Sequence, residues 1–199
     1  YEQVSNVEIH ASNPEITYMA HADAPQRTVY FETELKKNQE FMVDYSFDYH
    51  VDYVELDPAK VSEEQPNFCL EEQAPHIVFT PYLKELRDEL AGDETNPIIL
   101  ARRFYDFVTT KVMYSFMREY FTIECIPEYC AINLKGDCGV QALLFITLCR
   151  MSGIPARWQS GLYVTKYYTG CHDWAQFYVA PYGWVFADPS FGGSAWREG

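Results

Sequence analysis

The chain has 199 residues, of which 48% are hydrophobic and 22% are charged, so it can build a sizeable core and lacks the composition of a disordered chain. The formal net charge of −14 argues against partners that require a basic surface, which are nucleic acids and anionic lipids. Because no apolar run approaches the roughly 20 residues that span a bilayer, we expect no membrane insertion.

The first part of the chain has the residue pattern of β-strands. Between Phe41 and Tyr53 every odd position is apolar or aromatic, which is the period of two expected for a strand with one buried face. Weaker strand patterns cover residues 4–10, 16–22 and 27–35. We therefore predict a small antiparallel β-domain, built as a partial sandwich, over residues 1–57, and a polar, proline-containing linker over residues 58–75.

Helix signals begin after this linker. Thr80-Pro81 and Asn96-Pro97 each place a capping residue before a proline, and Gly92 follows the first of the two expected helices. Residues 119–137 have no periodic pattern and are predicted to form an irregular loop. A helix that is apolar on nearly all sides is predicted over residues 138–152, followed by strands over residues 156–165, 172–180 and 184–190. Helices followed by a sheet predict an α+β domain over residues 76–199.

The six cysteines match neither a disulfide framework nor the spacing of a metal-binding hook, so we expect no metal or other cofactor. Cys125 and Cys130 lie in the predicted loop, and whether they pair is left open. The chain opens at Tyr1 rather than at a methionine, so we expect that an N-terminal segment has been removed. The compartment is left open, although cysteine usage leans towards the cytoplasm.

Cys138 directly precedes the apolar helix, in the run Lys135-Gly136-Asp137-Cys138-Gly139. Asp137 is a plausible N-cap, which would place Cys138 in the first helical turn. The helix dipole and the unpaired N–H groups there favour an anion, so we expect a lowered thiol pKa. The same N–H groups suit the oxyanion of an acyl-transfer intermediate.

His172 and Asp188 lie on two strands that a short loop at Pro181-Tyr182-Gly183 would join as a hairpin. The expected register puts Trp174 opposite Asp188 and His172 one diagonal step away, with the imidazole and the carboxylate on the same face. A thiol, an imidazole and a carboxylate that orients the ring are the parts of a nucleophilic acyl-transfer site.

These residues carry a resemblance to the bacterial transglutaminase-like superfamily. It rests on Gly136 to Leu143, on Gly153-Ile154-Pro155-Ala156-Arg157, on His172-Asp173-Trp174-Ala175 and on Asp188-Pro189-Ser190, and it covers about residues 76–193. The resemblance implies a papain-like α+β core with Cys138 as nucleophile, His172 as acid–base and Asp188 as orienting carboxylate. It also implies further strands after Asp188, so the final sheet is expected either to be incomplete in this chain or to be completed by a segment outside it.

Four neighbouring residues are weighed beside this set. By the same resemblance, Tyr114 is a candidate second oxyanion donor, and Trp158 and Trp174 are candidates to shape an acyl-substrate groove, although all three could equally belong to the core. Asp173 departs from the small residue that is commoner after the histidine, and we expect it to face solvent rather than to tune His172.

The expected function is cysteine-dependent acyl transfer on amide bonds of proteins or peptides through a thioester. Hydrolysis by a peptidase or amidase is favoured over crosslinking by a protein-glutamine transglutaminase. Removal of asparagine-linked glycans, and a catalytically silent binding or scaffold module on the same fold, are the remaining alternatives. Substrate identity and oligomeric state are left open.

Overall fold

The computed structural model describes residues 2–11, 16–19, 29–34, 36–51 and 53–198. The chain divides into two compact units, Glu2–Asp52 and Tyr53–Gly199. No described helix is both long enough and apolar enough to cross a bilayer.

The first unit contains two two-stranded antiparallel ribbons. β1 (Glu2–Ala11) pairs with β4 (Val43–Val51), and β2 (Ile16–Met19) pairs with β3 (Val29–Phe31). The strand predictions at residues 20–22, 27–28 and 35 fall outside the described residues. The prediction of a buried face on the last strand was wrong, because Tyr45, Phe47 and Tyr49 are all exposed. A two-stranded ribbon has no second layer that could cover such a row.

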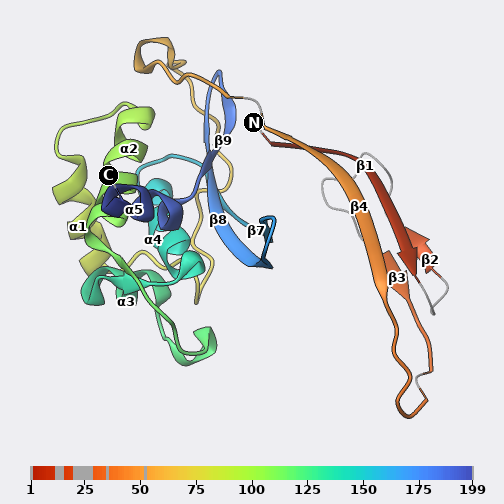
Figure 1. Cartoon of the computed structure of the whole chain (residues 1–199). Coiled ribbons are helices and arrows are strands. Elements are labelled where there is room, and N and C mark those ends of the chain that lie inside the picture. Colours follow the sequence, from red (N-terminus) through yellow and green to blue (C-terminus); the bar gives the residue numbers. More distant parts are fainter. Residues whose placement is uncertain (1, 12–15, 20–28, 35, 52, 199) are drawn as a thin grey trace. The chain divides into compact units, whose positions relative to one another are not determined.

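The second unit packs its helices to one side of a three-stranded sheet (Figure 1). Its helices, including two 3₁₀ turns, are η1 (Pro58–Lys60), α1 (Pro81–Ala91), α2 (Pro97–Lys111), η2 (Tyr120–Thr122), α3 (Ile126–Asn133), α4 (Cys138–Met151) and α5 (Pro189–Glu198). The antiparallel sheet has the order β7 (Ala156–Val164), β8 (Thr169–Val179), β9 (Gly183–Ala187). The chain therefore has the predicted α+β class, with the central helix against an antiparallel sheet.

The helix starts follow from the sequence signals. The hydroxyl of Thr80 accepts a hydrogen bond from the N–H of Leu83, and the side chain of Asn96 accepts from Ile98 and Ile99. α4 is the centre of the core: every residue from Gly139 to Arg150 is buried. The helix that is apolar on nearly all sides in the sequence is thus buried on all sides in the structure.

Two local predictions were wrong. The predicted loop over residues 119–137 contains α3, which is only eight residues long and ends on Leu134 in the left-handed region, so it lacks a long apolar period and a C-terminal glycine. The predicted strand over residues 184–190 ends at Ala187, and the chain continues from Pro189 as a helix. The side chain of Asp188 starts that helix.

The segment predicted as a linker, residues 58–75, is hydrogen-bonded to the second unit along its length. The N–H of Ser62 donates to the carbonyl of Ala180, and the N–H of Ala156 donates to the carbonyl of Cys69. The buried Arg150, near the end of α4, donates to the carbonyl of Glu71 at 2.6 Å. This segment thus closes the end of α4 opposite to Cys138.

Candidate active site

The start of α4 presents Cys138 at the surface of the core. The carboxylate of Asp137 accepts a hydrogen bond from the N–H of Val140 at 3.0 Å, which confirms Asp137 as the N-cap. The buried amide of Gln141 donates to the carbonyl of Gly136 at 3.0 Å and fixes the chain just before the helix. Cys138 itself is half-buried, so its side chain is held by the helix start yet remains accessible.

Tyr114 lies beside Cys138 because of a short parallel strand pair. β5 (Met113–Tyr114) pairs with β6 (Lys135–Gly136), and this register sets Tyr114 next to Gly136, two residues before the cysteine. The Tyr114 hydroxyl interacts with both the thiol and the backbone N–H of Cys138, and burial together with the nearby Cys138 and Asp137 raises the pKa of Tyr114. Tyr114 is thus a neutral donor at the position where a helix N–H group is also available.

The pKa of the Cys138 thiol is raised, against the expectation from the helix dipole. Burial is the main cause, and the carboxylates of Asp173 and Asp137 add to it, because negative charge close to the sulfur disfavours the thiolate. The backbone N–H groups of Asp173 and Gly139 hydrogen-bond the sulfur and oppose the rise. Burial and the two carboxylates therefore disfavour the thiolate form of Cys138.

His172 and Asp188 are brought together as the sequence predicts. The imidazole Nε2 lies 2.6 Å from Oδ2 of Asp188, and both side chains are largely buried. The pairing of β8 with β9 ends at Ala175 and Ala187, so the next step along both strands sets Trp174 opposite Asp188. The loop itself is Ala180–Tyr182, one residue earlier than predicted, and Gly183 opens β9 with a positive φ of 83°.

Cys138 lies beside the strand that carries His172. Beyond Ala175, β8 keeps its ladder with β7 only, so the backbone of residues 172–174 has no β9 partner. The hydrogen bond from the Asp173 N–H to the Cys138 sulfur is formed in this region. The nucleophile candidate is thus held against the residue next to the histidine.

Asp173 does not simply face solvent, and it does not contact the imidazole. Its side chain is half-buried, and one oxygen accepts a hydrogen bond from the Ser160 hydroxyl, which in turn accepts from Nε1 of Trp158 at 2.8 Å. Gly139 has no side chain, and a Cβ atom added there would lie 3.2 Å from the other oxygen of Asp173. The same added atom would lie 2.6 Å from the Trp158 ring. Asp173 and Trp158 therefore pack against the glycine that follows Cys138.

Trp174 stacks on the opposite side of the site, against His172. The two rings have centroids 6.0 Å apart and planes inclined by 28°. The indole fits over Gly161, where a Cβ atom would lie 2.6 Å from the ring. Trp158 and Trp174 thus border different parts of the site, the first at Cys138 and the second at His172.

Three site residues were missed by sequence reasoning. Tyr163 and Phe191 contact the imidazole at centroid distances of 6.2 and 4.9 Å, and the Tyr120 hydroxyl donates to Asp137. Tyr163 could have been found by alternation from Gly161, which lies opposite His172, once the strand pairing was known. Tyr120 lies in an irregular segment, and no periodic signal marks it.

The comparisons with known proteins identify the family of this chain. The model of the transglutaminase-like superfamily matches residues 84–189, which is more than half of the chain, and the chain therefore belongs to this superfamily. The match spans Tyr114, Cys138, His172 and Asp188.

Individual relatives are distant and longer than this chain. An uncharacterized protein of Haemophilus influenzae is 28% identical over 141 residues, which cover 57% of this chain and 37% of that protein. A crystal structure from Cytophaga hutchinsonii, provisionally described as a cysteine protease, matches with a TM-score of 0.67 and 19% identity over 95% of this chain and 66% of its own length. The periplasmic domain of TgpA from Pseudomonas aeruginosa matches with a TM-score of 0.52 and 19% identity over 64% of this chain and 47% of its own length. The two structural matches show a shared fold.

Proposed function

We propose that this chain is a cysteine-dependent acyl-transfer enzyme that acts on amide bonds of proteins or peptides through a thioester at Cys138. The observation that carries the proposal is the 2.6 Å contact between His172 and Asp188, formed next to the strand residue whose N–H meets the Cys138 sulfur. A carboxylate that holds an imidazole, close to a thiol at a helix start, is the set of groups that nucleophilic acyl transfer uses.

The reaction begins with the Cys138 thiol and the imidazole of His172. Because Asp188 holds Nε2, the other ring nitrogen, Nδ1, accepts the thiol proton as the sulfur attacks the substrate carbonyl carbon. The imidazole assists the attack because burial and nearby carboxylates raise the pKa of Cys138 and disfavour a free thiolate. Asp188 then stabilises the imidazolium that forms.

The backbone N–H of Cys138 and the Tyr114 hydroxyl serve as donors to the oxyanion of the tetrahedral intermediate. Collapse of the intermediate breaks the C–N bond, and the imidazolium gives its proton to the leaving amine. The thioester is then attacked by water, whose proton returns through His172, and a carboxylic acid and the free thiol are released. Hydrolysis is the favoured outcome, and attack by a primary amine would instead give a crosslink.

Intact-mass spectrometry after incubation with candidate glutamine- and asparagine-containing peptides, with and without a primary amine, tests the proposal. We expect a covalent acyl adduct on the wild-type chain, none on Cys138→Ala, and peptide products with a gain of one mass unit where amide has become acid. Incorporation of the amine into the peptide would assign the transglutaminase outcome. Absence of any adduct or product across the peptide set, with folded protein, would favour the binding module.

A further inference from the structure

A continuous row of aromatic rings runs along one face of the β-sheet and passes through the candidate catalytic histidine. Neighbouring ring centroids lie 6.0, 6.0, 6.2 and 6.3 Å apart. In order, its members are Phe186, Trp174, His172, Tyr163 and Tyr168. Phe191 from α5 leans on both His172 and Tyr163, at 4.9 and 5.1 Å. We call these six side chains the aromatic row.

Two glycines make room for the row. Gly161, opposite His172, lies under the Trp174 ring, and Gly170, opposite Tyr163, lies under the Tyr168 ring, where an added Cβ would lie 2.7 Å from Cζ. Each large ring therefore occupies space that a side chain at the glycine would need. The row is a built feature of the β7–β8 hairpin rather than a chance gathering of exposed residues.

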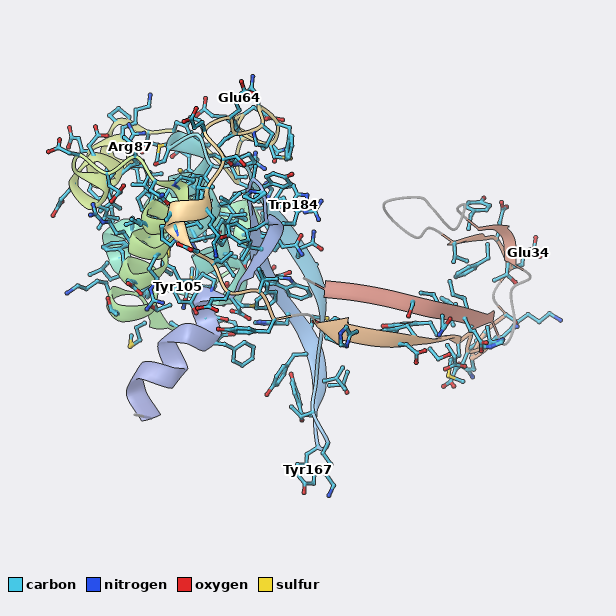
Figure 2. The ribbon with its side chains drawn as sticks, turned by 90° about the horizontal axis from the view of Figure 1, so that it is seen from above. Glu34, Glu64, Arg87, Tyr105, Tyr167 and Trp184 are labelled. Atoms are coloured by element: carbon cyan, nitrogen blue, oxygen red, sulfur yellow. The ribbon has the colours of Figure 1, made fainter. Side chains whose placement is uncertain are left out.

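The row is open to solvent away from the core. Tyr163, Phe191 and Tyr168 have exposed fractions of 37%, 44% and 62%. The hairpin projects away from the helices, and Tyr167 marks its free end (Figure 2). A run of large, partly exposed rings on a monomer surface marks a binding site more often than a packing feature.

The row also adjoins an apolar cavity. Phe186 and Phe191 belong both to the row and to the lining of a cavity of about 580 Å³, which reaches Phe145 and Phe177 in the core. Arg102 and Asp188 are the charged residues among its described lining, and Arg102 is paired with Asp106 at 2.8 Å. An uncharged, bulky group is what this cavity would accept.

We propose that the aromatic row and its cavity form the substrate-binding surface, and that they take an extended peptide segment with aromatic or branched aliphatic side chains at alternate positions. This inference rests on the proposed function, because it supplies the substrate class for the same site. Side chains on one side of an extended peptide repeat about every 6.6 Å, which is close to the ring spacing of the row. A peptide that lies along the aromatic row places its amide bonds next to His172. An apolar small molecule has no amide bond to place there, so a peptide is the better occupant.

Peptide panning with the Cys138→Ala protein tests the proposal without requiring turnover. The immobilised variant is exposed to a random peptide library at about 0.5 M salt, so that the chain's negative charge does not select basic peptides. We expect enriched peptides with aromatic or branched aliphatic residues at every second position. We expect their affinity to fall about tenfold or more when Tyr168→Ser is added, since aromatic anchors dominate such interfaces.

Tyr163→Ser provides a second variant for the case that Tyr168→Ser perturbs the hairpin, and Tyr82→Ser, which removes an exposed tyrosine from α1, is the matched control. The control should leave affinity unchanged. Enrichment of charged peptides, or no enrichment, would overturn the proposal. So would row variants that both bind the peptides as tightly as the Cys138→Ala protein does. Because binding is measured without Cys138, peptides that bind here yet never form a thioester on the wild-type chain would count against the proposed function alone.

Discussion

Asp188 uses its two carboxylate oxygens for different purposes. Oδ2 holds the imidazole of His172, while Oδ1 accepts hydrogen bonds from the hydroxyl and N–H of Ser190 and from the N–H of Phe191. Asp188 therefore caps α5 and orients the histidine with one side chain. These hydrogen bonds at the start of α5 fix the Asp188 carboxylate. Asp188 can therefore hold the His172 imidazole in one position although it lies just past the end of β9.

Asp173 is the residue at which this chain departs from the pattern that it resembles, and its charge lies close to Cys138. Asp173→Asn would keep the bond to Ser160 and remove one of the charges that raise the thiol pKa. We expect the pH at which Cys138 reaches half of its maximal alkylation rate to move to a lower value. Less negative charge near the sulfur makes the thiolate easier to form.

The measurement is the rate of iodoacetamide labelling of Cys138 against pH, followed by peptide mass mapping, with the exposed Cys171 as internal reference. Asp93→Asn, which removes an exposed carboxylate elsewhere on the surface, is the charge-matched control and should not shift the profile. A profile of Asp173→Asn that coincides with the wild-type profile would show that the carboxylate does not act on the thiol.

The contact of His172 with Asp188 and the place of Cys138 at the start of α4 could be predicted from the sequence better than their surroundings. Cys138, His172 and Asp188 follow from a cap before an apolar helix and from hairpin register, which are local signals. The raised pKa of Cys138 could not be predicted, because it comes from burial and from the charge of Asp173. Both depend on how α4 packs against β8, which no local pattern in the sequence reports. Tyr114 was found by resemblance, but its contact with Cys138 depends on a two-residue parallel pairing that no sequence period announces.

At the scale of the element, α4 carries the site because its first turn is crowded. Gly139 packs beneath Tyr120, Trp158 and Asp173, so the helix start can approach β7 and β8 closely only without a side chain there. The hydrogen bond of Asp137 to Val140 and the bond of Gln141 to Gly136 then fix the position of Cys138 between them.

Gly139→Ala should therefore damage the site more than the fold. The added Cβ would lie 2.6 Å from the Trp158 ring, so Trp158 or the helix start must move, at a cost of about 1–3 kcal/mol in the free energy of unfolding. We expect a lower midpoint in urea unfolding and loss of thioester formation in the folded variant. Wild-type thioester formation by Gly139→Ala would mean that the packing around the first turn is not needed.

The element boundaries show where local signals end. The starts of α1, α2 and α4 were readable from Thr80, Asn96 and Asp137, because a capping side chain acts within one turn. α3 was missed because its short length depends on packing against α4 rather than on its own pattern. The exposed face of β4 was mistaken for a core face, since a period of two reports a strand and not what covers it.

At the scale of the whole chain, the second unit begins before the region that matches the family model. Within residues 58–75, Ser62 donates to Ala180 just past the end of β8, and Cys69 accepts from Ala156 of β7. The carbonyl of Glu71 accepts from Arg150 of α4. Arg150 is buried and donates to the carbonyls of Ala156 and Glu71 as well as to Gln73, so removing its partners would leave a buried cation without acceptors.

Two truncations separate the contribution of the first unit to stability from that of residues 58–75. A chain that starts at residue 53 keeps the whole second unit and should unfold cooperatively. A chain that starts at residue 76 loses Glu71 and Gln73, two of the three acceptors of Arg150, and keeps only the carbonyl of Ala156. It should be several kcal/mol less stable, or fail to fold. Chemical denaturation followed by circular dichroism compares them, and equal stability of the two chains would contradict a structural role for residues 58–75.

The most direct test of the site is labelling with a peptidyl chloromethyl ketone, which a thiol assisted by a neighbouring imidazole attacks faster than an ordinary thiol does. We expect the reagent to modify Cys138 selectively among the six cysteines, and His172→Ala to slow that reaction by roughly 10²–10⁴-fold. Labelling that instead follows exposure, with Cys171 ahead of Cys138 and no effect of His172→Ala, would show that the thiol and the imidazole do not work together.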